Sequence, residues 1–180
     1  MWNGWNDAAV VRALREFCDR EGAFLLVKSR KKTPVPDYTA EVADLCVYDD
    51  AHYPATVLEA LSIASLSVSY YSNSLFESVA MGVPHLWVTY EAQDYNGSVG
   101  TYFPRFYSPN EGSPFQRTGV ATAWSIAETL AKLPTRRLAD FAIDTAARAR
   151  FVTEFLGFEP GGGSTRLLDA VEHARARAAG

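Results

Sequence analysis

The sequence predicts an α/β fold in which helices flank a parallel sheet. Short apolar runs with β-branched and aromatic residues alternate with longer segments whose apolar residues recur at helical spacing. Glycine or proline follows most of these segments and marks where they end. Strands that alternate with helices along a chain form parallel sheets. We therefore expect residues 1–180 to form one α/β domain.

The composition is that of an ordinary globular domain. The chain has 180 residues, and 48% of them are hydrophobic, which is enough to bury a core. A net charge of −4 gives no basic excess, so nucleic acid is not an expected partner. The first residues lack the pattern of a signal peptide, and no run reaches the roughly 18 apolar residues of a membrane helix. These features favour a cytoplasmic location, with Cys18 and Cys46 as reduced core thiols.

The first third of the chain predicts two helices and two strands. A helix is expected at 7–21, because its apolar residues fall on one face and Gly22 follows it. The run 23–27 is continuously apolar, which is typical of a parallel strand covered on both faces. A second strand is expected at 45–49 and a second helix at 55–65.

The stretch 66–90 is the most informative part of the chain. It predicts a strand, a tight turn at 72–74, a helix and a further strand that begins at His85. Gly82 lies where a helix commonly ends, and Pro84 prevents the helix from continuing. A polar turn between a strand and a helix N-terminus can bind an anion, because free N–H groups and the helix dipole face the same point.

The remainder of the chain predicts a long loop and three helices. Residues 91–118 combine turn residues with six aromatic side chains, so we expect an ordered and partly packed loop. The C-terminal helices lie within 123–180, with a short strand just before them. The expected bounds are 119–122 for the strand and 123–133 and 136–156 for two helices. A last helix is expected to begin at Ser164 or Thr165, which would cap it. Its apolar residues Leu167, Leu168 and Val171 are expected to face inward, and its tail is expected to fray.

Polar and basic side chains follow three of the predicted strands. In open parallel sheets, ligands bind beyond the carboxyl ends of the strands. Lys28 and Arg30 follow the first strand and would neutralise phosphate charge, although a run of basic residues is also typical of a solvated loop. His52 follows the second strand, where it would act as a proton shuttle, contact a base or simply lie at the surface.

Two interpretations fit the turn of Ser72, Asn73 and Ser74 with the nearby Glu77. The first is a capping box, in which Ser74 and Glu77 exchange side-chain to backbone hydrogen bonds. The second is a nucleotide site, in which the turn binds a diphosphate and the Glu77 carboxylate accepts both hydroxyls of a ribose. Spacing alone leaves both open. Nucleophile elbows, phosphate-binding P-loops, dinucleotide fingerprints and zinc spacings do not occur in the sequence.

The segment SYYSNSLFESVAMGVPHL, at 69–86, resembles the nucleotide-binding segment of GT-B glycosyltransferases. The resemblance implies that Ser72, Asn73 and Ser74 bind the donor diphosphate and that Glu77 binds the ribose. The run RARFVTEFLGFEPGGGSTRLLDAV is similar to the end of the CDP-glycerol glycerophosphotransferase family, and its Arg166 becomes a candidate phosphate contact. That family typically has an Asp where this chain has Glu77. The Glu at this position makes the chain more similar to the sugar-transferring branches of the group.

The resemblance also implies a Rossmann-like domain that is the C-terminal, donor-binding half of such a transferase. The donor would be a nucleotide-sugar or CDP-glycerol, and Glu91 and Asp94 would contact donor hydroxyls. No cofactor or metal is implied. The first, central strand of such a domain should precede residue 7, where MWNGWN is too short and polar. We therefore expect a gap or a displaced strand in the sheet. We also expect an N-terminal acceptor-binding domain or chain as partner, with peripheral association at the inner face of a membrane through that half.

Two other functions remain compatible with the sequence. One is a non-catalytic nucleotide-binding or assembly module that uses the same turn. The other is an epimerase-type enzyme of the same fold that acts on the nucleotide sugar itself.

Overall fold

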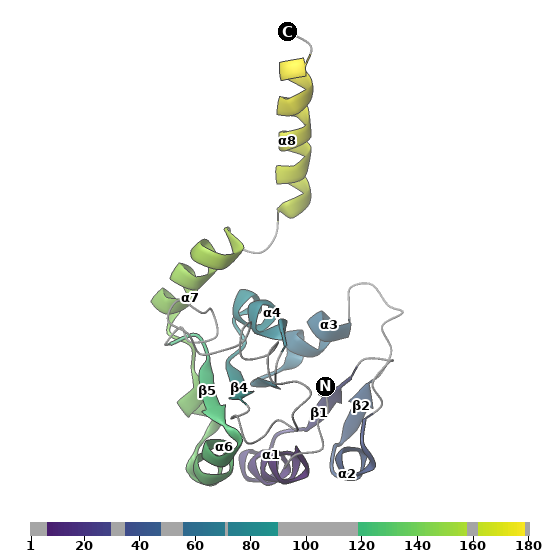
Figure 1. Ribbon diagram of the computed structural model, residues 1–180, viewed down its shortest axis with the longest axis vertical. Helices are drawn as coiled ribbons and strands as arrows, with labels where there is room; N and C mark the ends of the chain where they lie inside the picture. Colours follow the sequence, from purple (N-terminus) through teal and green to yellow (C-terminus); the bar gives the residue numbers. More distant parts are fainter. Residues whose placement is uncertain are drawn as a thin grey trace, which may run out of the picture.

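The computed structural model describes residues 7–29, 35–47, 56–70, 72–89, 119–157 and 162–178. It confirms an α/β fold with parallel sheets flanked by helices, compatible with a Rossmann-like arrangement (Figure 1). The predicted loop at 91–118 lies outside the described residues.

The described strands form two separate parallel sheets. In the first sheet β1 (Leu26–Lys28) pairs with β2 (Leu45–Val47). In the second sheet β4 (His85–Thr89) lies between β3 (Ser67–Ser69) and β5 (Thr122–Ser125). Strand pairing does not join β1 to β3 within the described residues.

The second sheet contains the core of the molecule, and β4 is its centre. Leu86 and Val88 point to one face, and Trp87 points to the other, as the alternation of a strand requires. On the Leu86 face lie α1 (Asp7–Glu21), α6 (Ile126–Lys132), η3 (Leu133–Thr135) and η4 (Leu138–Phe141). On the Trp87 face lie α4 (Ser74–Met81) and α7 (Thr145–Phe151). Helices therefore cover both faces of β4.

The first sheet is much less buried than its sequence predicts. The apolar run 23–27 predicts a strand that is covered on both faces, yet Phe24 is 66% exposed and β1 is only half-buried. In β2, Leu45 is 46% exposed. Cys46 is likewise only half-buried, whereas Cys18 lies in the core as expected.

The predicted ends of two helices are confirmed. The helix α1 spans Asp7–Glu21, and α4 ends at Met81. Gly82 follows α4 with a φ of +74°, a left-handed conformation that favours glycine. The helix expected at 55–65 is α3 (Thr56–Ile63), and the short helix α2 (Asp37–Ala40) was not predicted.

The C-terminal third departs most from the prediction. The strand expected at 119–122 is β5, which begins three residues later than predicted. Ser125 is the N-cap residue of α6 and forms a capping box with Glu128. The prediction of one long helix at 136–156 is wrong. The segment is divided into η4, α7 and a π-helical turn, η5 (Val152–Leu156). Asp140 accepts the backbone N–H of Arg137 at the start of η4, and Asp144 accepts the backbone N–H of Ala147 at the start of α7.

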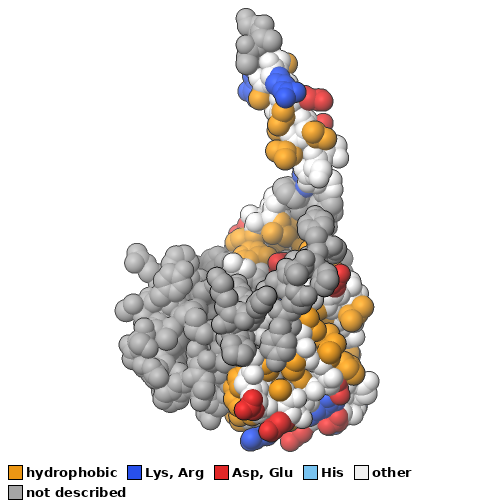
Figure 2. Space-filling view, turned by 90° about the vertical axis from the view of Figure 1, so that its right-hand side faces the viewer, with side chains coloured by type: hydrophobic (Ala, Val, Ile, Leu, Met, Phe, Trp, Pro, Cys, Tyr) orange, Lys and Arg blue, Asp and Glu red, His pale blue; other side chains and the backbone are white. Residues whose placement is uncertain are grey.

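The last helix, α8 (Gly163–Ala178), stands away from the body of the protein (Figure 1). The prediction that its apolar residues face inward is wrong, since Leu167 is 66% exposed and Leu168 is 62% exposed. Figure 2 shows hydrophobic side chains at the surface of this helix. The tail expected to fray is helical as far as Ala178. None of the described helices combines the length and apolarity needed to cross a membrane.

Candidate functional site

The turn between β3 and α4 is the candidate site, and the structure brings its three polar residues together. The hydroxyl oxygen of Ser72 accepts the backbone N–H of Ser74 at 3.1 Å. Asn73 immediately precedes the helix, and its carbonyl accepts the N–H of Phe76 at 3.0 Å. The exposed side chain of Asn73 makes no capping hydrogen bond. Its amide therefore remains available to a ligand.

Glu77 does not form the capping box that its spacing allows. Ser74 is already the first residue of α4, and Asn73 occupies the cap position. The Glu77 side chain is half-buried, and it makes no hydrogen bond or ion pair with any described residue. Burial raises the pKa of this carboxyl, because the charged form loses hydration. The structure thus leaves a partly desolvated acidic group one helical turn from the polar turn.

A buried histidine lies behind the turn. His85 is 1% exposed and is the first residue of β4. Its Nε2 lies 2.9 Å from the hydroxyl of Ser69 at the end of β3, and its Nδ1 lies 3.1 Å from the hydroxyl of Ser78 in α4. Burial lowers the pKa of His85 to about 3, so the ring is neutral near pH 7. This Ser69–His85–Ser78 cluster joins the two elements on either side of the turn.

The sequence analysis missed this cluster, because it considered His85 only as the first residue of a strand. One signal could have revealed it. Ser78 lies three residues after Leu75 and directly before Val79, so helical spacing places its hydroxyl on the apolar face. A serine on a buried face needs a polar partner, and His85 is the nearby polar residue whose strand is otherwise apolar.

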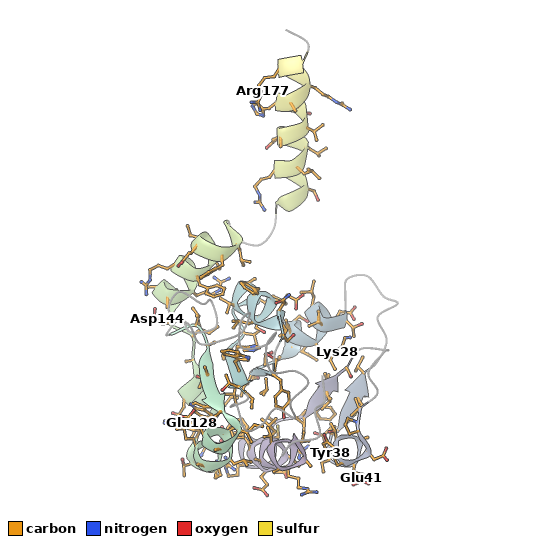
Figure 3. The ribbon with its side chains drawn as sticks, viewed as in Figure 1. Lys28, Tyr38, Glu41, Glu128, Asp144 and Arg177 are labelled. Carbon is orange, nitrogen blue, oxygen red and sulfur yellow. The ribbon has the colours of Figure 1, made fainter. Side chains whose placement is uncertain are left out.

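Lys28 lies at the end of β1, in the first sheet (Figure 3). The sequence predicts that it lies on a loop next to the 72–74 turn. Strand pairing does not join β1 to β3 within the described residues, so the pairing alone does not place Lys28 beside the turn. The Lys28 ammonium donates to the carbonyl of Ser29 at 3.1 Å.

Four of the other candidate residues, Arg30, His52, Glu91 and Asp94, lie outside the described residues. Arg166 lies near the start of α8, on the helix that stands away from the body (Figure 1).

The described residues contain no group of three or more acidic, histidine or cysteine side chains that could hold a metal ion. Comparison of the chain with protein-family models, curated proteins and solved structures gives no match. The functional argument therefore rests on the geometry of the turn and on the chemistry of its residues.

Proposed function

We propose that the turn between β3 and α4 binds the diphosphate of a nucleotide and that Glu77 binds its ribose. The observation that carries this proposal is the half-buried Glu77 carboxylate, which has no partner among the described residues. A carboxylate that loses hydration without a compensating bond costs stability, and such groups are concentrated at functional sites. Two vicinal ribose hydroxyls would donate to its two oxygens.

The backbone of the turn supports the diphosphate part of the proposal. The N–H groups at the start of a helix carry partial positive charge, and they attract phosphate. The N–H of Leu75 has no acceptor among the described residues, and the amide of Asn73 is free of capping bonds.

We further propose that the chain is the donor-binding half of a GT-B-like transferase. The acceptor hydroxyl would come from an N-terminal domain or a separate chain, at a cell-surface polymer or another hydroxyl compound. The hydroxyl oxygen would form a bond to the transferred glycosyl or glycerophosphate group and lose its proton to a base on the acceptor side, while the bond from that group to the nucleotide breaks. Negative charge then develops on the departing phosphate, where the N–H groups of the turn would stabilise it.

Calorimetry with UDP, CDP and GDP tests the binding step. We expect the wild-type protein to bind at least one of these nucleotides and Glu77→Gln to bind it about tenfold more weakly, since a charge-assisted hydrogen bond contributes about 1.5–3 kcal/mol. Glu59→Gln is the matched control, because Glu59 is an exposed carboxylate on the neighbouring helix α3. No binding of any nucleotide would refute the site, and equal binding by Glu77→Gln would refute the role of Glu77.

Turnover separates transfer from binding alone. Once an acceptor half is supplied, incubation with UDP-sugars or CDP-glycerol should release the nucleotide and a transferred group. Binding without release would identify a non-catalytic nucleotide-binding module, and conversion of the sugar while it remains attached to the nucleotide would identify an epimerase-type activity.

A further inference from the structure

The Ser69–His85–Ser78 cluster has more polar contacts than it has protons to share. The Ser78 hydroxyl lies 2.7 Å from the Ser74 carbonyl, and the Ser69 hydroxyl lies 3.1 Å from the Tyr70 carbonyl. The imidazole makes two further contacts, from Nε2 to Ser69 at 2.9 Å and from Nδ1 to Ser78 at 3.1 Å. Each serine hydroxyl has one proton and a neutral imidazole has one N–H, so three protons serve four contacts.

The surroundings of the ring favour its neutral form. His85 is buried, and both of its nitrogens face serine hydroxyls. A doubly protonated ring would supply the fourth proton, but neither nitrogen contacts a carboxylate that would balance the charge. A buried charge without such a partner is costly, so one of the four contacts has no proton.

Two arrangements of the three protons are possible, and they differ in the contact that each gives up. With the ring proton on Nε2, the Ser78 hydroxyl must donate to Nδ1, and the shortest contact of the cluster, to the Ser74 carbonyl, is lost. With the ring proton on Nδ1, the Ser78 oxygen accepts that proton while its own hydroxyl still donates to Ser74. The Ser69 hydroxyl then donates to Nε2, and only its 3.1 Å contact with the adjacent carbonyl is given up. The second arrangement keeps both of the shortest contacts.

We propose that His85 carries its proton on Nδ1 and is a positioning residue for the turn between β3 and α4. The hydrogen bonds then run in one direction, from Ser69 at the end of β3 through the ring to Ser78 and on to the Ser74 carbonyl. Ser74 is the first residue of α4, and its N–H donates to the hydroxyl of Ser72. The chain of bonds thus fixes the residue at which the helix begins, next to the proposed phosphate. The positioning role rests on the proposed nucleotide site, whereas the position of the proton does not.

The proton position can be measured without any ligand. In a two-bond ¹H–¹⁵N spectrum, the two ring nitrogens of a neutral histidine have distinct shifts, and their cross-peak pattern distinguishes the tautomers. The chain has three histidines, so the His85→Asn spectrum identifies the His85 signals by their loss. We expect a protonated Nδ1 at pH 7, whereas a histidine in water favours a protonated Nε2. A proton on Nε2, or on both nitrogens, would overturn the proposed chain of bonds.

Two serine variants should affect the ring proton differently. In Ser69→Ala, Nδ1–H still donates to Ser78 and the Ser78 hydroxyl still donates to Ser74, so the proton should stay on Nδ1. In Ser78→Ala, Nδ1–H loses its acceptor, whereas Nε2–H can donate to Ser69 and the Ser69 hydroxyl to the carbonyl of Tyr70. The proton should therefore move to Nε2 in Ser78→Ala. The same tautomer in both variants would overturn the proposed direction of the bonds.

The same pair of variants tests the positioning role. Ser78→Ala disconnects Ser74 from the ring, and we expect it to weaken binding of UDP, CDP or GDP about fivefold, the effect of about one hydrogen bond. Ser69→Ala leaves that link in place, and we expect less than about a twofold change. Thermal unfolding of both variants shows that each is folded at the temperature of the binding measurement. Equal affinities in the two variants, or a larger loss in Ser69→Ala, would refute the role.

Substitution of the histidine itself gives an independent test. An asparagine amide reaches approximately the position of Nδ1, from which it can donate to Ser78, whereas a glutamine amide reaches that of Nε2. His85→Asn should therefore keep nucleotide affinity closer to wild type than His85→Gln, with thermal unfolding recorded for both. The reverse order would overturn the positioning role. If the wild-type protein binds none of the three nucleotides, the proposed function and the positioning role fail together, and the proton assignment is still decided by the spectrum.

Discussion

The two sheets of this protein are built from similar apolar runs, yet their environments differ. In the second sheet, the first four residues of β4 are buried, and two hydrophobic clusters pack against its opposite faces. In the first sheet, β1 is half-buried, and neither cluster contains a residue of β1 or β2. The comparison shows that an apolar run predicts a strand but not its burial, which depends on the helices that cover it.

The difference bears on the proposed site. Ser69, Ser78 and His85 belong to the well-packed sheet and its helix α4. Ser78 and His85 are buried and Ser69 is half-buried, so packed residues support the turn at 72–74. Lys28 belongs to the less-packed sheet. We therefore expect the turn at 72–74 to be rigid and the first sheet to open more easily. The following predictions test this contrast.

Leucine truncation in the two sheets should have the largest effect. Leu86→Ala in β4 removes a fully buried side chain from the core and should lower the free energy of unfolding by about 2–5 kcal/mol. Leu45→Ala in β2 removes a side chain that is 46% exposed and should cost about 1 kcal/mol or less. Urea denaturation of both variants gives the comparison. Similar losses would mean that the two sheets contribute equally to stability.

His85 should make stability depend on pH below neutrality. Its pKa is about 3 in the folded protein and about 6.5 when unfolded, so the unfolded chain takes up a proton that the folded chain excludes. Stability therefore falls as pH falls through 6.5, by about 1.4 kcal/mol per pH unit, or about 2 kcal/mol between pH 6.5 and 5. The difference in urea midpoints between wild type and His85→Gln isolates this effect.

His173, which is exposed on α8, provides the control substitution. His173→Gln removes a histidine without removing a core side chain, and its unfolding is measured over the same pH range. If His85→Gln retains the wild-type slope between pH 6.5 and 5, the ring is not held neutral by burial.

Arg148 should stabilise the helix that carries the proposed site. From α7, its guanidinium donates to the carbonyls of Val79 and Ala80 at 2.8 and 2.5 Å, and thus satisfies the C-terminal end of α4. Arg148→Ala should lower the free energy of unfolding by about 1–3 kcal/mol, because two carbonyls lose a charged donor. Arg150→Ala, an exposed position on the same helix, should change it by less than about 0.5 kcal/mol. A small effect of Arg148→Ala would indicate that water replaces the guanidinium.

The sequence predicted the elements around the turn well, for identifiable reasons. The helices α1 and α4 are followed by Gly22 and Gly82, whose left-handed conformations end them where expected. The polar turn and the strand at His85 follow from local patterns that need no tertiary information. The fold class was predictable because strands and helices alternate throughout the described chain.

The other features of the fold and the site could not be predicted, because they depend on contacts between distant parts of the chain. The apolar spacing from 136 to 156 is compatible with one helix, but the structure divides this segment. Asp140 and Asp144 accept backbone N–H groups at the starts of two separate helical turns. Arg137 and Leu138 also bind the Glu21 carboxylate of α1, which is distant in the sequence. The capping box of Ser74 and Glu77 was plausible from spacing but depended on where α4 begins. The bonds of His85 join three elements, so no local pattern could reveal them in full.

The smallest expected effect is local and concerns the edge of the first sheet. The Asp44 carboxylate accepts the backbone N–H of Leu25 at 2.7 Å and pairs with Arg15 of α1. The hydrogen bond from Leu25 lowers the pKa of Asp44 most, and the bond from Arg15 lowers it further. Both interactions are therefore present at neutral pH and are lost as pH falls through the lowered pKa. Asp44→Ala should speed amide hydrogen exchange at Leu25 and in β1, with little change in β4. Exchange resolved by NMR measures this, and Asp19→Ala is the control, since it removes only the other partner of Arg15. Equal acceleration in β4 would show that the two sheets open as one cooperative unit, which would contradict the contrast between them.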